Sequence, residues 1–294
     1  MTYSVIAFDP ESGAFGVAVQ SHWFNVGRTA PWVRFGVGAV VTQALTDPSY
    51  GWRGLDAMGE GIPADRALSR LLADDPDRER RQVAFVDPEG RVAVHTGSRC
   101  ISHAGHVVGE GWAVLGNLLA SERVVDAMAE VFPRARGTLA ERMVATLEVA
   151  QENGGDIRGV QSAAIRIAPG RDELEEGFEA GIDFSVPDHP DPIAELRRLI
   201  TVDRAYRALR RGQTALADGK EALALHHLSL AERLPHGVEL DFWRALALFE
   251  LGKVEAASET MAAVLGQAPQ FEEVLRRLAE VDPVARRLRE SGLH

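Results

Sequence analysis

Cysteine is almost absent from this sequence: among its 294 residues, only Cys100 carries a thiol. A single cysteine excludes an internal disulfide framework and a thiolate metal cluster within one chain. The sequence also lacks any run approaching the ~18 apolar residues of a membrane span, and its start lacks the basic and apolar segments of a secretion signal. We therefore expect a soluble protein of the reducing cytoplasm, with no membrane partner.

Basic residues are in the minority. The sequence holds 32 Lys and Arg against 43 Asp and Glu, which gives a formal net charge of -11. A nucleic-acid groove and an anionic membrane surface both require a basic face on the protein, so this balance argues against both partners. Apolar residues make up 46% of the chain, enough for sizeable cores, and the length suits two domains.

The two parts of the chain follow different patterns. Residues 1 to about 185 mix short β-rich runs with helical stretches, whereas the residues after about 195 read as successive helices. Three prolines, Pro187, Pro190 and Pro192, lie between the two parts in a polar context that breaks regular structure. We predict a mixed domain over residues 1–190, a linker, and an all-helical domain over residues 195–294.

Strand and helix patterns alternate in the first part. Apolar runs predict strands at residues 3–8, 15–20, 36–43, 83–86, 92–95 and 161–167, with turns at residues 9–14 and 87–90. Residues 121–132 and 138–153 carry apolar side chains at helical spacing. Period-two geometry places Thr2, Ser4 and Ile6 on one face of the first strand. This order favours an α+β fold, in which helices cover two stacked, mostly antiparallel sheets.

The second part contains an internal repeat. The segment that begins at Gly219 recurs in kind at Gly252, a separation of 33 residues (252 − 219), and Pro235 and Pro269 are 34 residues apart (269 − 235). This is the period of a helix-turn-helix solenoid, and it resembles a tetratricopeptide repeat over residues 202–270. Because about three repeats are needed for independent stability, we expect this part to pack on the first domain or on another subunit.

Thr2 could carry chemistry by itself. If Met1 is removed, the threonine has a free α-amine, whose pKa near 8 leaves it partly unprotonated at neutral pH, so nucleophile and base share one residue. Methionine aminopeptidases remove Met1 when the second residue is small, as Thr2 is. The alternative is that Thr2 only begins a strand.

Short polar clusters interrupt the apolar strands of the first part: Gln20-Ser21-His22, Thr42-Gln43, His95-Thr96-Gly97 and Leu115-Gly116-Asn117. Taken singly, each fits a turn or a strand end. Taken together, they supply donors for a developing oxyanion, from Asn117, Gln43 or backbone N–H groups near Gly97 and Gly116. The spacing leaves that choice open.

We expect no metal and no cofactor. The nine histidines include His103 and His106, which are three residues apart with His95 nearby, but no adjacent Asp, Glu or Cys completes a metal-ligand spacing. We interpret Cys100 as structural, because no base in the sequence is paired with it.

The first part of the chain also resembles a known family. The resemblance covers about residues 1–200 and is carried by residues 2–9, 13–21, 36–44, 48–51, 75–82, 95–97, 104–106, 116–117 and 154–164. The opening, a hydroxyl residue followed by a strand, a turn and a returning strand, is similar to that of N-terminal nucleophile (Ntn) hydrolases. The wider set resembles a bacterial family of unknown function, DUF1028, which is placed in that superfamily.

This resemblance implies a four-layer αββα sandwich and hydrolysis of an amide bond in a small amide, a cyclic imide or a peptide. Carried onto this chain, Thr2 is the nucleophile and its free amine is the base. Gln43 and Asn117 are the other candidate catalytic residues. The candidate binding residues are Ser21, His95, Thr96 and Gln161.

Two other functions stay open. The protein could be a binding or scaffold protein in which the first domain has lost catalysis and the helical repeats, residues 195–294, recruit a peptide or partner chain, since solenoids present concave surfaces. Alternatively, the repeats could mediate self-association only, and we expect a homo-oligomer.

Overall fold

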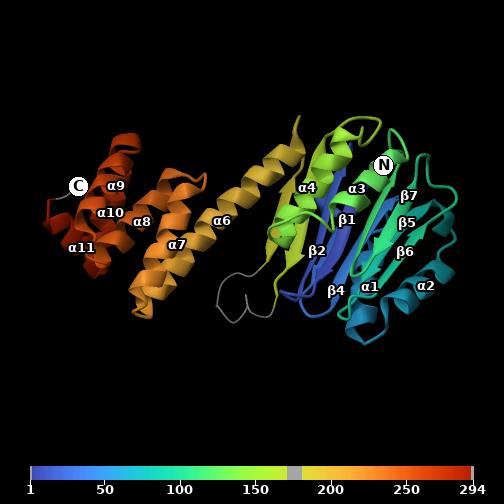
Figure 1. Cartoon of the computed structure of the whole chain (residues 1–294), viewed down its shortest axis with the longest axis horizontal. Coiled ribbons are helices and arrows are strands. Elements are labelled where there is room, and N and C mark those ends of the chain that lie inside the picture. Colours follow the sequence, from blue (N-terminus) through green and yellow to red (C-terminus); the bar gives the residue numbers. More distant parts are fainter. Residues whose placement is uncertain (1, 171–180, 293–294) are drawn as a thin grey trace. The chain divides into compact units, whose positions relative to one another are not determined.

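The computed structural model describes residues 2–170 and 181–292, which fall into two compact units, one up to Arg198 and one from Leu199 onward. Figure 1 shows strands and covering helices in the first unit and helices alone in the second. The mixed α/β fold with two antiparallel sheets that the sequence predicted is confirmed.

The larger sheet of the first unit has six strands in the order β10-β9-β2-β1-β8-β7, and each neighbouring pair is antiparallel. The bounds of its strands, in chain order, are β1 Thr2–Asp9, β2 Ala14–Ser21, β7 Gly105–Gly109, β8 Trp112–Asn117, β9 Ser162–Ala168 and β10 Ile182–Val186. Strand β1 lies near the centre of this sheet, so its first residue has a neighbouring strand on both sides.

The smaller sheet has four antiparallel strands in the order β3-β4-β5-β6. Their bounds are β3 Pro31–Arg34, β4 Gly38–Ala44, β5 Arg81–Val86 and β6 Val92–Thr96. A short 3-10 turn, η1, at Val26–Arg28 precedes β3, and a second, η2, at Arg78–Arg80 precedes β5.

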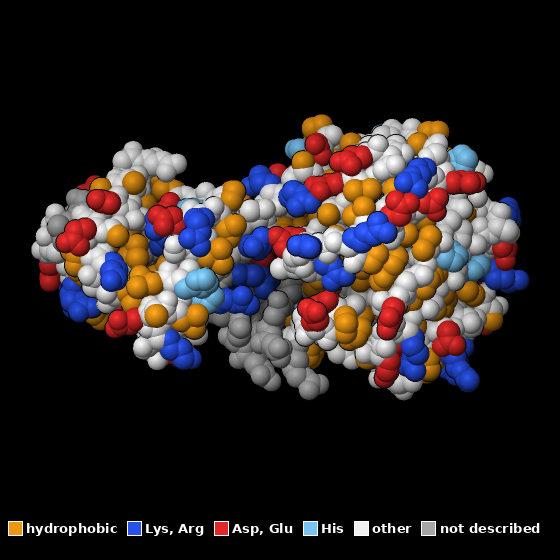
Figure 2. Space-filling view, in the orientation of Figure 1, with side chains coloured by type: hydrophobic (Ala, Val, Ile, Leu, Met, Phe, Trp, Pro, Cys, Tyr) orange, Lys and Arg blue, Asp and Glu red, His pale blue; other side chains and the backbone are white. Residues whose placement is uncertain are grey.

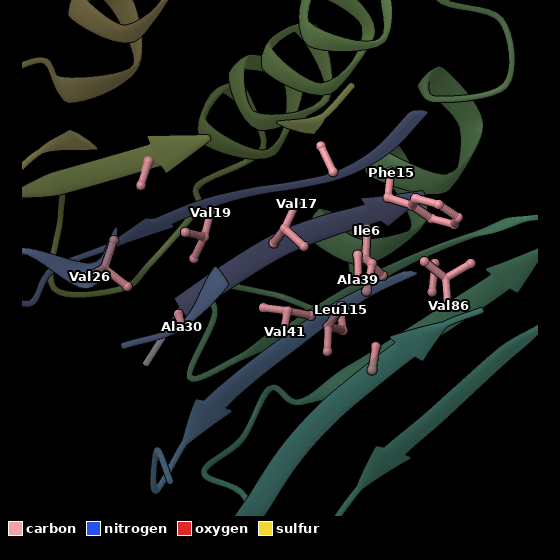
Figure 3. Close-up of a cluster of buried hydrophobic side chains, with 14 residues drawn as sticks. Ile6, Phe15, Val17, Val19, Val26, Ala30, Ala39, Val41, Val86 and Leu115 are labelled. Atoms are coloured by element: carbon pink, nitrogen blue, oxygen red, sulfur yellow. The ribbon is translucent and has the colours of Figure 1, made fainter. Parts of the chain in front are cut away.

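The two sheets pack face to face through a buried apolar cluster. Figure 3 shows Ile6 and Val17 of the larger sheet directed toward Val41 and Val86 of the smaller one. These side chains alternate along their strands with residues that face the helices, as the period-two pattern requires. Apolar burial of this kind is the main favourable term in folding, and here it fixes which residues of each strand face the interior.

Helices cover the outer face of each sheet (Figure 1). Helices α1, Ser49–Gly59, and α2, Ala64–Asp74, pack on the smaller sheet through a second apolar cluster that includes Leu68 and Phe85. Helices α3, Arg123–Val131, and α4, Leu139–Glu152, pack on the larger sheet. Helix α4 begins with a capping box, in which the Thr138 hydroxyl accepts from the Glu141 N–H and the Glu141 carboxylate accepts from Thr138.

The second unit is helical throughout its described residues. Its helices are the C-terminal part of α6 Pro192–Ala217, then α7 Glu221–Arg233, α8 Val238–Glu250, α9 Val254–Gln267, α10 Phe271–Val281 and α11 Pro283–Glu290. The repeat is visible in the backbone: Gly219 and Gly252 both adopt positive φ, at 72° and 71°, before α7 and α9. The equivalent Ala224 and Ala257 are both fully buried, as close helix packing requires.

Most predicted elements of the first unit are present, with ends shifted by a few residues. The predicted helix at 121–132 is α3, and the predicted strand at 161–167 is β9. The sequence patterns missed α1, α2, β3, β7 and β10. Figure 2 shows acidic and basic side chains interspersed on the face that it draws. The ion pairs of the first unit include that of Arg123 with Glu130.

Candidate functional site

The Thr2 hydroxyl is buried at the start of β1. The residue is 5% exposed, and its Oγ1 donates to Ser21 Oγ at 3.1 Å. Ser21 ends β2, the strand paired with β1, and faces the same side of the sheet. The period-two prediction for the first strand is confirmed, because Ser4 also points between the sheets, where its hydroxyl donates to Gln43 Oε1 at 2.8 Å.

Two buried amide side chains face the backbone carbonyl of Thr2, and a third links them to each other. Gln43 of β4 and Asn117 of β8 direct their amide nitrogens toward this oxygen, at 3.3 and 3.5 Å. The same two nitrogens donate to Gln82 Oε1, at 2.7 and 2.9 Å. Gln82 belongs to β5, so one side chain links amides from both sheets. The residues come together because Thr2 lies opposite Asn117, and Gln43 opposite Gln82, in the strand registers.

The orientation of the Gln82 amide follows from its other contacts. Its Nε2 lies within 3.0 Å of three oxygens, those of the Thr96 hydroxyl, the Gly105 carbonyl and the Gly116 carbonyl. An amide NH2 group has two hydrogens, so one of these contacts is shared. With Nε2 facing these acceptors, Oε1 must accept from Gln43 and Asn117. The weakest contact in the network is then the one at 3.5 Å between Asn117 Nδ2 and the Thr2 carbonyl oxygen.

A pocket of about 170 Å³ ends at Asn117. Its other lining residues come from the end of β4 and the next residue, from η2 before β5, and from the segment after β6: Ala44, Leu45, Arg80, Arg99, Cys100 and Ile101. Asn117 therefore connects the network around Thr2 to a space that a small ligand could enter. Burial raises the pKa of the Cys100 thiol in this wall, so the thiol is held protonated.

Buried polar groups hold the segments next to Ser21, at the end of β2. Asp156 accepts from the His22 backbone N–H at 3.2 Å and pairs with Arg158 at 2.8 Å. Burial acts to raise the pKa of Asp156, but its hydrogen bonds with Arg158 and His22 outweigh this and lower the pKa. Ser162, opposite Ser21 in the register, accepts from Val26 N–H and donates to the Trp23 carbonyl. These contacts fix the end of β2, where Ser21 faces Thr2.

The structure brings together five of the seven residues singled out from the sequence: Thr2, Ser21, Gln43, Asn117 and, through Gln82, Thr96. It places the other two elsewhere. His95 directs its Nε2 to the Arg78 carbonyl at 2.8 Å, on the opposite face of β6 from Thr96. Gln161 donates to Asp188 at 3.2 Å, just before β9 begins.

The central residue of the network, Gln82, was missed from the sequence. It interrupts an apolar strand, as Gln43 does, and the same criterion would have found it. His106 was considered only as a metal ligand, but its Nδ1 lies 2.8 Å from Thr96 Oγ1 at the edge of the network. Burial, followed by the nearby His95, lowers the pKa of His106 and favours its neutral form.

Two features are absent from the described residues. No group of three or more His, Cys, Asp or Glu side chains in residues 2–170 and 181–292 is placed to hold a metal ion. Across the same ranges, no helix is both long and apolar enough to cross a membrane.

Comparison with known proteins assigns the family. A family model described as a family of unknown function, DUF1028, matches residues 2–196. The chain belongs to the DUF1028 family. The crystal structure of protein SPO2555 from Silicibacter pomeroyi, assigned to DUF1028, superposes with a TM-score of 0.62 at 28% sequence identity, covering 68% of this chain and 84% of that chain. No curated protein matches the sequence. The network around Thr2 lies wholly within the part that the DUF1028 model matches.

Proposed function

We propose that this DUF1028 protein is an Ntn-type amidohydrolase with Thr2 as its nucleophile. The observation that carries the proposal is the position of Thr2. Its hydroxyl is buried between two sheets and bonded to Ser21, and the residue is paired across the strands with Asn117, which lines a pocket. A threonine that merely began a strand would need none of these surroundings. The order of helix pair, sheet, sheet and helix pair supports the αββα sandwich implied by the Ntn resemblance.

The chemistry requires removal of Met1, which lies outside the described residues. The freed α-amine of Thr2 then takes the proton from Oγ1 as this oxygen attacks the carbonyl carbon of the amide substrate. The proton passes to the departing nitrogen when the C–N bond breaks, and water hydrolyses the resulting ester. In this proposal Ser21 positions the Thr2 hydroxyl by accepting its hydrogen bond.

Asn117 is the best-placed oxyanion donor. One of its amide hydrogens is committed to Gln82 at 2.9 Å, but the other has only the 3.5 Å contact with the Thr2 carbonyl. That hydrogen can turn to a developing oxyanion in the adjoining pocket with little loss. Removing one such donor typically costs ~10²–10³ in kcat. Gln43 is less available, because it bonds Gln82 at 2.7 Å and accepts from Ser4.

The test combines protein mass with activity. Intact-mass measurement should show loss of Met1, and release of primary amine from a panel of simple amides should be followed for wild type, Thr2→Ser and Thr2→Ala. We expect Thr2→Ser to retain turnover and Thr2→Ala to lose at least ~10³-fold. Ser4→Ala is the matched control, since it removes a buried hydroxyl from the same face of the same strand without touching the nucleophile. Turnover by Thr2→Ala equal to that of the wild type would remove Thr2 from the reaction.

A further inference from the structure

The pocket that ends at Asn117 has a basic wall in an acidic protein. Arg80 and Arg99 both line it, and no Asp or Glu is among its described lining residues. The chain as a whole carries a formal net charge of -11, so a pocket wall with two arginines and no acidic residue among its described lining differs from the average surface. A local basic site of this kind attracts anions even when the protein as a whole is negative.

The neighbouring acids are committed elsewhere. Glu79 accepts from the Ser98 backbone N–H and hydroxyl, at 3.0 and 2.8 Å. Asp75 pairs with Arg81 at 2.8 Å. Both carboxylates keep their negative charge, and that of Glu79 acts on Cys100, but neither side chain lines the pocket or pairs with Arg80 or Arg99.

The two arginines of the pocket are available. Arg80 has only a 3.6 Å contact with Asp77 between half-exposed side chains, which contributes little. Arg99 forms no ion pair within the described part of the chain. An incoming anion would therefore displace only this weak contact at Arg80 and no ion pair at Arg99.

We propose that the substrate carries a carboxylate, held by Arg80 and Arg99, a short distance from the amide bond that Thr2 attacks; this rests on the hydrolase proposed above. Guanidinium groups match carboxylates in geometry and bind them through charge-assisted hydrogen bonds. Ala44, Leu45 and Ile101 supply apolar walls for the carbons between the two groups.

The size of the pocket limits the substrate further. At ~30 Å³ for each water-sized group, the 170 Å³ pocket accommodates about six non-hydrogen atoms. This fits a carboxylate with up to three further atoms. The substrate class is thus an amide whose carboxylate is separated from the amide group by one or two carbons, such as an N-acyl amino acid or a half-amide of a short dicarboxylic acid.

Cys100 provides a binding assay that does not need catalysis. It is the only cysteine of the chain and lies in the pocket wall, so alkylation by neutral iodoacetamide, followed by intact mass, reports on access to this pocket. The assay uses the full-length Thr2→Ala protein, which prevents turnover. The probes are N-acetylglycine and its neutral analogue N-acetylglycinamide, each at ~20 mM, above the ~1 mM Kd expected for a fragment with two charge-assisted contacts.

We expect N-acetylglycine to slow Cys100 alkylation at least tenfold and N-acetylglycinamide to leave the rate unchanged. Arg80→Gln and Arg99→Gln should each weaken the binding of N-acetylglycine about tenfold, and the double variant should abolish the protection. Both arginines are exposed, so neither change should unfold the protein. Arg70→Gln, an exposed arginine of α2 outside the pocket, is the control and should protect as its parent does.

Equal protection by the acid and the amide, or no protection by either, would overturn the carboxylate site. So would protection that persists in the double variant. The hydrolase proposal is judged separately: selective protection together with Thr2-independent turnover would leave the carboxylate site standing and refute the nucleophile. Thr2-dependent turnover without any preference for acids would refute the carboxylate site alone.

Discussion

Two buried glutamines of the same fold should respond in opposite ways to one substitution. Gln82 of β5 and Gln20 of β2 are both fully buried. Gln82 makes five contacts of 3.0 Å or less, whereas neither Oε1 nor Nε2 of Gln20 has a hydrogen-bond partner among the residues that the structure describes. Leucine has nearly the volume of glutamine, so Gln82→Leu and Gln20→Leu change the bonding far more than the packing.

The magnitude of each change follows from the contacts. Gln82→Leu removes the acceptor of two buried amide groups, those of Gln43 and Asn117, and each unsatisfied group costs about 1–3 kcal/mol. The leucine regains about 1–2 kcal/mol of apolar burial, so the net loss of stability is about 3 kcal/mol. Gln20→Leu deprives no described residue of a hydrogen bond and removes a buried unsatisfied amide, so we expect a gain in stability of about 2 kcal/mol.

Urea unfolding on a Trp243→Phe background would measure the difference. The four remaining tryptophans, Trp23, Trp32, Trp52 and Trp112, all lie in the first unit, so their fluorescence follows that unit without a signal from the second. A gap of about 5 kcal/mol between the variants corresponds to a midpoint difference of about 2.5 M at an m-value of about 2 kcal/mol/M. If Gln20→Leu were as destabilising as Gln82→Leu, burial itself and not hydrogen bonding would govern both sites.

Three smaller predictions test other parts of the chain. Because burial raises the pKa of Cys100, its alkylation rate without ligand should still be rising above pH 9, and a plateau at lower pH, seen by intact mass, would contradict this. Thr138→Ala removes the capping box of α4 and should cost about 1 kcal/mol in the same urea experiment. In the second unit, followed through Trp243, Gly252→Ala places a side chain at φ 71° and should destabilise by about 1 kcal/mol, whereas Gly266→Ala inside α9 meets open space and should stabilise by about as much.

The sequence predicted the strands of the first unit wherever apolar residues ran together, as in β1, β2 and β5. Strands such as β7, Gly105–Gly109, and β10, Ile182–Val186, were missed because they are short, lie at the edges of the larger sheet and are only partly buried. An edge strand needs no continuous apolar face, so the pattern that marks a central strand is weak there. Helix α1 was missed for another reason: Gly51, Gly54 and Gly59 lower its helix propensity, although Gly51 and Gly54 are sites of close packing against Trp32 and Phe85.

Period two also explains which candidate residues converge. Thr96 and His95 are neighbours in sequence, and consecutive side chains of a strand point to opposite faces, so only one of them could enter the interior between the sheets. Val92 and Val94 pack against the core cluster between the sheets, which assigns Thr96 to the interior and His95 to the other face. The sequence held this information, and naming both residues as candidates did not use it.

The network itself required knowledge that no local pattern supplies. Thr2 meets Asn117 across 115 residues, and Gln82 joins β4, β7 and β8 only because the two sheets stack in one register. A shift of one residue in any of these pairings would turn the amide to the opposite face of its sheet. The second unit shows the opposite. Local sequence alone predicts the turns at Gly219 and Gly252. Where contacts are local, sequence predicts the structure. Where residues from four strands must come together, polar residues at strand ends identify only the candidates. The apolar core between the sheets determines which of them meet.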